Sequence, residues 1–245
     1  MKISICIPMY NEITTVAATA AELVRVMDGY CGGNGDSYEL IFSDDGSEDG
    51  TFEAIPKTEA VGARHGVIVP IRTSANYGKG AAVRRAAIAS TGDVVMYTDC
   101  DLAYGTEAII DAVEVMKKGG CDMLTGSRAI HPDGYKSYTR MRKLASKVYI
   151  KLLNIITGLN VTDSQCGFKL FGGALARRIF PLAETNGWAF DLELFLLAAR
   201  EGAVIKEHPV SIVNHRESRV SVLRDSVKML REMIVIKNRI KNLDR

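Results

Sequence analysis

The sequence predicts an α/β fold built on a doubly wound, mostly parallel sheet. In the first two thirds of the 245 residues, short apolar runs alternate with segments of helical periodicity. The apolar runs are four to six residues long and nearly uninterrupted, as in parallel strands that are covered on both faces. A content of 47% hydrophobic and 24% charged residues is ordinary for a globular protein. No internal repeat divides the chain, so one domain is expected.

The elements follow from these two periodicities. In the first predicted helix, Val16, Ala20, Leu23, Val24 and Met27 recur at helical spacing. The predicted strands cover residues 3–7, 38–43, 66–71, 93–98 and 121–126, and the predicted helices between them cover 13–28, 50–63, 79–90 and 106–118.

Two basic, amphipathic helices are predicted in the last third of the chain. They cover residues 139–157 and 220–243. Such helices either lie in a membrane interface or pack on their own domain. We expect a domain over 1–219, with the basic helix of 220–245 as part of it. In that helix an apolar stripe is flanked by cations; the stripe is Leu223, Val227, Leu230 and Ile234, and the cations are Arg224, Lys228, Arg231 and Lys237.

Charge is divided unevenly along the chain. Residues 1–135 carry 11 Lys and Arg against 19 Asp and Glu, a net charge of −8, whereas residues 136–245 carry 20 against 10, a net charge of +10. An acidic half suits a metal ion, and a basic half suits phosphates or an anionic membrane surface. We expect no nucleic-acid partner.

The sequence shows no recognisable targeting signal, and we therefore expect a cytoplasmic chain. No apolar run approaches the roughly 20 residues that span a bilayer, and the first residues, MKISICIPMYNE, do not resemble a signal peptide. Five scattered cysteines without a C-x-x-C pair argue against a disulfide framework and a zinc site.

Two carboxylates end the fourth predicted strand. Asp99 and Asp101 flank Cys100, and alternation along an extended segment points both side chains the same way. Two carboxylates this close repel one another unless a cation lies beside them, and Mg²⁺ or Mn²⁺ completed by substrate phosphates is a common solution. A strand-end turn with two solvated acids is the alternative.

An acidic loop, SDDGSEDG, follows the second predicted strand. Asp45, Ser47, Asp49 and Gly50 match the start of a calcium loop, but its twelfth position is Pro56, where a glutamate is required. This excludes the calcium loop. A tight acidic turn and a loop that recognises a nucleoside remain.

A glycine-containing turn, NYGKGAAV, precedes the third predicted helix. Val83 replaces the last glycine of the dinucleotide fingerprint, which leaves an NAD-binding domain as a weak alternative. Lys79 near a helix N-terminus would suit an anion, although an exposed basic turn is equally compatible.

Two acids lie in an apolar helical segment, WAFDLELFLLAA. Asp191 and Glu193 are two positions apart and cannot share one helical face. Either one of them points toward the core or a pocket, or both stabilise the helix N-terminus through its dipole.

Taken in order, these motifs resemble the family 2 inverting glycosyltransferases, which have a GT-A nucleotide-sugar domain. The later motifs are similar to those of the dolichyl-phosphate β-glucosyltransferases, within the polyprenyl-phosphate hexosyltransferases. The resemblance covers nearly the whole chain and rests on ICIPMYNE, FSDDGSEDGT, NYGKGAAVRRAA, YTDCD, GSR, DSQCGFKLFGG, WAFDLELF and EHPVSI.

The resemblance implies a donor site at the strand ends. Asp99 and Asp101 would bind Mg²⁺ or Mn²⁺ and the nucleotide diphosphate. From its place near a helix N-terminus, we expect Lys79 to contact the UDP-sugar donor as well. In the family, the element corresponding to Glu217-Ser218-Arg219 reads Gly-Ser-Lys, so Arg219 would approach the donor diphosphate. The nucleoside pocket would be lined by Pro8, Tyr10, Glu12, Asp44 and Asp45.

The resemblance also implies an acceptor site for a dolichyl or polyprenyl phosphate. Arg128, Arg142 and Ser146 would bind its phosphate, and a forked guanidinium suits that group. A phosphate oxygen would attack C1 of a hexose, glucose being favoured. Asp191 would orient the sugar or the acceptor arginines, but it would have to act as the base if the acceptor were a hydroxyl. The chain would then be a cytoplasmic or peripheral membrane enzyme.

Three alternatives differ in class. The first is a soluble glycosyltransferase that acts on a glycan or protein. The second is a nucleotide-sugar-binding protein without turnover. The third is the NAD-binding domain.

Overall fold

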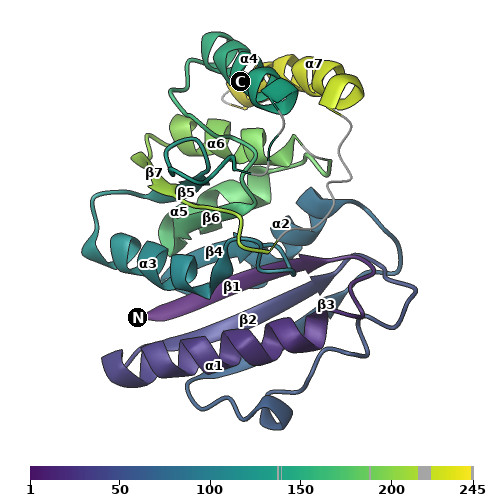
Figure 1. The fold of residues 1–245 in the computed structure, drawn as a ribbon, viewed down its shortest axis with the longest axis vertical. Coiled ribbons are helices and arrows are strands. Elements are labelled where there is room, and N and C mark those ends of the chain that lie inside the picture. Colours follow the sequence, from purple (N-terminus) through teal and green to yellow (C-terminus); the bar gives the residue numbers. More distant parts are fainter. Residues whose placement is uncertain (137, 139, 188, 215–221, 244–245) are drawn as a thin grey trace.

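The computed structural model describes residues 1–243 apart from 137, 139, 188 and 215–221. Its seven-stranded sheet has the order β3-β2-β1-β4-β6-β5-β7 (Figure 1). Every described strand pair is parallel except those of β6, which runs antiparallel to both β4 and β5. The predicted α/β class with a mostly parallel sheet is confirmed. The strands are β1 Lys2–Met9, β2 Ser37–Asp44, β3 Gly66–Arg72, β4 Val94–Thr98, β5 Met123–Ser127, β6 Phe168–Gly172 and β7 Ile205–Pro209.

Helices cover both faces of this sheet. The α-helices are α1 Val16–Asn34, α2 Lys79–Ala89, α3 Gly105–Lys118, α4 Arg140–Thr157, α5 Gly173–Ile179, α6 Phe190–Arg200 and α7 Val222–Lys241, and two short 3₁₀ helices are η1 Glu59–Val61 and η2 Phe180–Leu182. Two buried clusters follow from the alternation of strand side chains. Ile3, Ile5 and Ile7 of β1 pack with α1 and α3, whereas Cys6 of the same strand packs with α2, α5 and α6.

The predicted helix over 50–63 is wrong. Residues 51–54 form turns, and only η1 is helical within this range. Pro56 lies in the middle of it and cannot donate the backbone hydrogen bond that a continuing helix requires. Gly62 then takes a left-handed φ of 66° and ends η1.

Helices α4 and α7 lie side by side, and α6 lies beneath them (Figure 1). Met233, Ile236 and Ile240 of α7 belong to the same buried cluster as α2 and α6. Arg239 of α7 pairs with the fully buried Glu193 of α6. These contacts support the proposal that the C-terminal helix is part of the main domain. The side chains of the predicted stripe at 223, 227 and 230 lie outside the described residues, and Ile234 is exposed.

Candidate active site

The site lies where the parallel strands β1, β2 and β4 end. Pro8 and Met9 of β1 lie opposite Ser43 and Asp44 of β2. The following loops are therefore brought to one edge of the sheet, which is where α/β folds bind ligands.

The first of these loops contains the predicted nucleoside contacts of β1. Pro8 is buried within the strand, and Tyr10 beyond it is exposed. Asn11 has a positive φ of 55°, so the chain turns sharply there. The backbone N–H of Glu12 donates to the Thr51 hydroxyl at 2.7 Å, which ties this loop to the one after β2.

Asp44 and Asp45 are buried and anchor the neighbouring loops. Asp44 accepts hydrogen bonds from the backbone and hydroxyl of Ser47. Asp45 Oδ2 accepts from the backbone N–H groups of Tyr77 and Gly78, at 3.0 and 2.6 Å, and its Oδ1 lies 3.0 Å from Arg85. In this structure both side chains shape the loops at this edge of the sheet, and their contact with a nucleoside stays a prediction.

Asp99 and Lys79 form an ion pair at the mouth of the site. Lys79 Nζ contacts Asp99 Oδ1, and the side chains are 24% and 33% exposed. Burial lowers the pKa of Lys79, but the carboxylates of Asp99, Asp191 and Asp101 outweigh it, so that the pKa is raised overall. Lys79 therefore remains an ammonium ion at the first position of α2, whose N-terminus also favours anions.

The residues after β4 fit the divalent ion that the sequence predicts. Among the described residues, no three His, Cys, Asp or Glu side chains converge as a complete metal cage. Mg²⁺, however, is commonly held by one or two carboxylates with water and substrate phosphates. Asp99 already has a cation, the Lys79 ammonium, against one oxygen. Asp101 accepts from the Ala103 backbone N–H at 3.1 Å, which fixes its carboxylate at the same turn.

Asp191 is part of a buried triad that the sequence analysis did not predict. Its Oδ1 accepts from the Tyr97 hydroxyl and from Lys169 Nζ, the latter at 2.7 Å. Lys169 is fully buried and also donates to the carbonyl oxygens of Ser164 and Cys166. Burial and the Asp191 charge keep the pKa of Tyr97 well above its usual value. A lone lysine in the apolar run GFKLFGG was the available signal, because a buried lysine requires an anionic partner.

Two of the three predicted acceptor residues, Arg128 and Ser146, have described side chains. Arg128 is held by Asp163, with Nε and Nη2 at 2.6 and 2.8 Å from the two carboxylate oxygens, and Nη1 donates to the Tyr138 hydroxyl at 2.8 Å. Ser146 hydrogen-bonds to Tyr135. Arg142 lies on α4 but its side chain is outside the described residues, as is Arg219 altogether.

Several buried polar atoms around this triad have no partner among the described residues. Tyr149 Oη, Ser164 Oγ and Gln165 Nε2 are buried without a hydrogen bond. Tyr149 also has a raised pKa because of burial and the nearby Asp191 charge. Native proteins rarely leave such atoms unsatisfied. Hydroxyl groups of a polar ligand could satisfy them.

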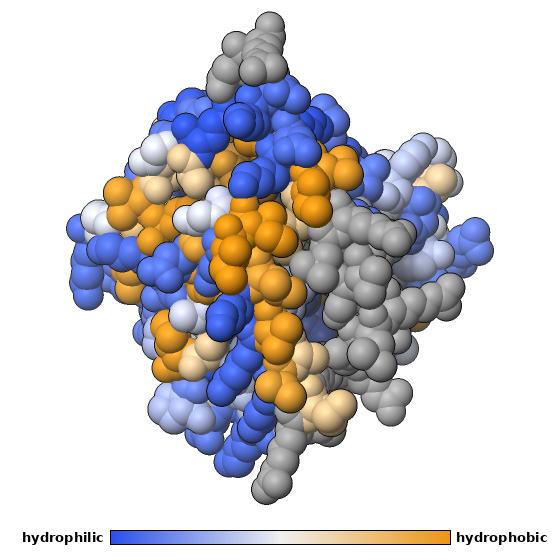
Figure 2. Space-filling model, turned by 90° about the horizontal axis from the view of Figure 1, so that it is seen from above, coloured by the Kyte–Doolittle hydropathy of each residue, from blue (hydrophilic) through white to orange (hydrophobic). Residues whose placement is uncertain are grey.

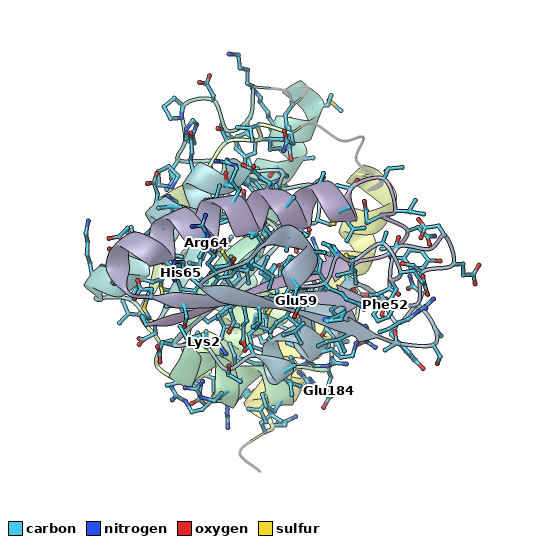
Figure 3. The ribbon with its side chains drawn as sticks, turned by 90° about the horizontal axis from the view of Figure 1, so that it is seen from below. Lys2, Phe52, Glu59, Arg64, His65 and Glu184 are labelled. Atoms are coloured by element: carbon cyan, nitrogen blue, oxygen red, sulfur yellow. The ribbon has the colours of Figure 1, made fainter. Side chains whose placement is uncertain are left out.

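A cavity of about 650 Å³ elsewhere is separate from this site. It lies between the second half of α1 and the segment that leads into β3, and its lining includes Arg25, Asp28 and His65. Figure 3 shows Arg64 and His65 beside α1. His65 directly precedes β3, so this cavity lies at the amino end of a strand, away from the loops of the candidate site.

A match to the description "Glycosyl transferase family 2" covers residues 4–180. The chain belongs to this glycosyltransferase family. The resemblance noted in the sequence is therefore confirmed, and so is the prediction of an enzyme that transfers sugars. The matched region includes Asp44, Lys79, Asp99, Asp101 and Arg128, whereas Asp191 lies beyond it.

Similar family 2 glycosyltransferases include proteins named for dolichyl phosphate. The dolichyl-phosphate beta-glucosyltransferase of Saccharomyces cerevisiae is 29% identical over 249 residues, which cover 96% of this chain and 74% of that protein. The enzyme of the same name from Dictyostelium discoideum is 26% identical, covering 97% and 74%. Glycosyltransferase AglD of Haloferax volcanii is 30% identical over 94% of this chain, but the chain spans only 36% of AglD.

Solved structures confirm the GT-A fold of this glycosyltransferase. Glucosyl-3-phosphoglycerate synthase of Mycobacterium tuberculosis, crystallised with Mn²⁺, UDP and phosphoglyceric acid, has a TM-score of 0.67 and 22% identity, covering 98% of this chain and 78% of that one. Mannosyl-3-phosphoglycerate synthase of Rubrobacter xylanophilus also has a TM-score of 0.67, with 20% identity over 98% and 73%.

Proposed function

We propose that this glycosyltransferase moves glucose from UDP-glucose to a dolichyl or polyprenyl phosphate, with inversion at C1, and that it requires Mg²⁺ or Mn²⁺. The observation that carries the proposal is the placement of Asp99, Asp101 and Lys79 together at the N-terminus of α2. Support for the acceptor comes from the relatives that are named dolichyl-phosphate beta-glucosyltransferases. Support for the donor and the ion comes from the neighbour crystallised with UDP and Mn²⁺.

The reaction is a single displacement. An acceptor phosphate oxygen forms a bond to C1 of the glucose while the bond from C1 to the UDP oxygen breaks, and the electron pair leaves with UDP. A bound divalent ion would neutralise charge on the leaving diphosphate. Lys79 and the backbone N–H groups of α2 add positive charge on the protein side. A phosphate monoester is already an anion at pH 7, so it needs no general base.

Asp191 acts in this mechanism as an orienting group. Two buried donors, Lys169 and Tyr97, hold its Oδ1 in one position. A carboxylate fixed in this way can accept hydrogen bonds from sugar hydroxyls without reorganising. Because the acceptor supplies its own negative charge, no proton needs to pass to Asp191.

The acceptor phosphate would lie between Arg128 and the start of α4. Asp163 takes two of the five guanidinium N–H groups of Arg128 and Tyr138 takes a third. Within the described part of the chain, two are left for a phosphate oxygen. Arg142 and Ser146 are four positions apart on α4 and share a side of the helix.

The outer face of α4 suits contact with a membrane. Met141 and Ile155 are 77% and 69% exposed, and Leu144 and Val148 lie between them at helical spacing. Figure 2 looks onto the end of the molecule that carries α4 and α7 and shows an apolar ridge with hydrophilic side chains beside it. No acidic residue occurs in α4, whereas five basic ones do, namely Arg140, Arg142, Lys143, Lys147 and Lys151.

This combination favours an anionic lipid surface over a second copy of the chain. A two-fold dimer through α4 would bring its five cations against the same five cations. Anionic cytosolic leaflets attract basic segments, and we therefore propose peripheral contact with the cytosolic face of a membrane. None of the helices in the described part of the chain has the apolar length that a bilayer crossing needs. We place the proposed contact on α4 because it combines an exposed apolar face with five basic residues and no acidic one.

The test is nucleotide release from UDP-glucose, UDP-GlcNAc and GDP-mannose, each with Mn²⁺ or EDTA and with or without a short polyprenyl phosphate. We expect UDP release from UDP-glucose only when metal and lipid phosphate are both present. Release that ignores the lipid but requires a glycan or peptide would replace the proposed acceptor. Binding of UDP without any release would leave a nucleotide-sugar-binding protein.

A further inference from the structure

We propose that Lys79 is a tethered counterion that occupies the cation position of Asp99 until a divalent ion displaces it toward the donor diphosphate. This inference rests on the proposed metal-dependent reaction and assigns Lys79 a second role within it. The direct observation is the contact between Lys79 Nζ and Oδ1 of Asp99, one of the two carboxylates expected to bind the ion. A divalent ion that binds the Asp99 carboxylate is repelled by an ammonium ion held against the same carboxylate.

The surroundings of Lys79 hold an excess of negative charge. The carboxylates of Asp99, Asp101 and Asp191 all act on its ammonium group. Asp191 has its own buried partner in Lys169, whereas Asp99 is one third exposed and open to an ion from solution. Without Lys79, Asp99 would lose the cation that α2 places against its carboxylate.

The backbone that carries Lys79 is held rigidly on both sides. Asp45 accepts from the Gly78 backbone N–H at 2.6 Å, and the Gly80 N–H donates to the Asn186 carbonyl at 2.9 Å. A Cβ at Gly78 would lie 2.6 Å from the Asn186 carbonyl oxygen, and one at Gly80 would lie 2.7 Å from the Phe190 Cβ. The loop therefore cannot shift far, and the movement belongs to the flexible four-carbon side chain of Lys79 alone.

The alternative partner of Lys79 lies within reach of that side chain. Lys79 is the first residue of the eleven-residue α2, and side chains at a helix start point back toward its N-terminus, where the donor diphosphate would bind. An ammonium group released from Asp99 can pair with a diphosphate oxygen there. Lys79 then has an anionic partner both before and after the ion binds.

A thermodynamic coupling follows from this exchange. Without UDP, a divalent ion must displace Lys79 from Asp99 and leave its ammonium group without that partner, so ion binding is weak. With UDP, the diphosphate supplies the new partner. UDP should therefore tighten ion binding, and by linkage the ion should tighten UDP binding by the same factor.

The test is Mn²⁺ binding to the intact protein, measured by the loss of the free-ion electron paramagnetic resonance signal, with and without UDP. Lys79→Met keeps the length of the side chain and removes its charge. We expect Lys79→Met to bind Mn²⁺ about tenfold more tightly than the original protein in the absence of UDP, as the loss of one nearby cation implies. Its UDP-dependent gain in Mn²⁺ affinity should shrink, and Lys79→Arg should retain it.

The control is Arg84→Met, which removes a cation from the same helix. Arg84 contacts the Ala183 carbonyl and the Asn186 side chain instead of Asp99, so its loss should leave Mn²⁺ affinity without UDP nearly unchanged. Equal Mn²⁺ affinity in Lys79→Met and the original protein would overturn the inference. Absence of Mn²⁺ binding in both, even with UDP, would overturn the inference and the metal requirement together. Tighter Mn²⁺ binding in Lys79→Met, together with no glucosyl transfer to lipid phosphate by the original protein, would uphold the inference and reject the proposed reaction.

Discussion

Lys169 Nζ lies 2.7 Å from Oδ1 of Asp191, and the lysine side chain is completely buried. Removing one partner of such a pair leaves an uncompensated charge in a medium of low dielectric constant. We expect Lys169→Met to lower the free energy of unfolding by about 3–5 kcal/mol. The double variant Lys169→Met/Asp191→Leu should recover much of that loss, because it leaves neither charge behind. Urea unfolding of the two single variants and the double variant gives a double-mutant cycle. If the free-energy losses of the two single variants simply add up in the double variant, a direct pairing of Lys169 with Asp191 is contradicted.

Gly167 allows Asp99 to take its position in the site. A Cβ on Gly167 would lie 2.5 Å from Asp99 Oδ2, so Gly167→Ala must displace this carboxylate. We expect Mn²⁺ binding in the presence of UDP to weaken about tenfold, the effect of moving one charged ligand by a fraction of its contact distance. Isothermal titration calorimetry measures this change in Mn²⁺ affinity.

Gly29→Ala is the matched control for that substitution. Gly29 lies in α1, and no atom lies within 4 Å of its built Cβ. This change should stabilise the protein by about 0.5–1 kcal/mol through helix propensity and leave Mn²⁺ binding unaltered. Equal effects of both alanines on Mn²⁺ binding would rule out a specific role of Gly167.

The exposed face of α4 should govern attachment to vesicles. We expect Leu144→Glu/Ile155→Glu to reduce partitioning onto phosphatidylserine-containing liposomes about tenfold or more, since each apolar side chain contributes up to about 1.5–3 kcal/mol on burial. Ile88→Glu is the control, because Ile88 is 57% exposed but belongs to α2. Sedimentation with the liposomes gives both values. Unchanged sedimentation of the α4 variant would exclude this face as the contact.

His208 should make the protein less stable in mild acid. Burial lowers the pKa of this half-buried side chain in β7 below 6.5, and the Asp111 charge offsets only part of the effect. Below pH 6.5 the unfolded chain binds a proton that the folded chain does not, so the free energy of unfolding falls until the folded-state pKa is reached. Urea unfolding between pH 8 and pH 5 should show this decline, and His208→Gln should remove part of it. An identical pH slope in the variant would assign the decline to other groups.

The sequence predicts strands well where burial on both faces makes them continuously apolar. This holds for β1, β2, β4 and β5, each of which overlaps its predicted range. Phe168–Gly172 was not predicted as a strand because Lys169 interrupts its apolar pattern. In the structure this lysine is buried and pairs with the carboxylate of Asp191. Ile205–Pro209 was not predicted because three consecutive polar residues, Lys206, Glu207 and His208, leave it without an apolar run.

The site residues also differ in whether the sequence alone could predict them. Asp99 and Lys79 were predicted because their motifs follow directly from strand ends and a helix start. Asp163 and Lys169 come from a distant segment, and only the strand order brings them to Arg128 and Asp191. The inward direction of Asp45 was equally out of reach, since it depends on the backbone of residues 77 and 78.

The reversed strand β6 also bears on how the chain folds during synthesis. β4 and β5 are consecutive strands in the sequence, yet they do not pair, because β6 lies between them. Until residues 128–167 have been made and 168–172 insert, β4 must keep one backbone edge unpaired and β5 must keep both, since its other partner, β7, comes later still. Exposed strand edges invite pairing with other chains. The slow folding step of this protein, and its greatest risk of aggregation on the ribosome, should therefore be the closing of this central gap.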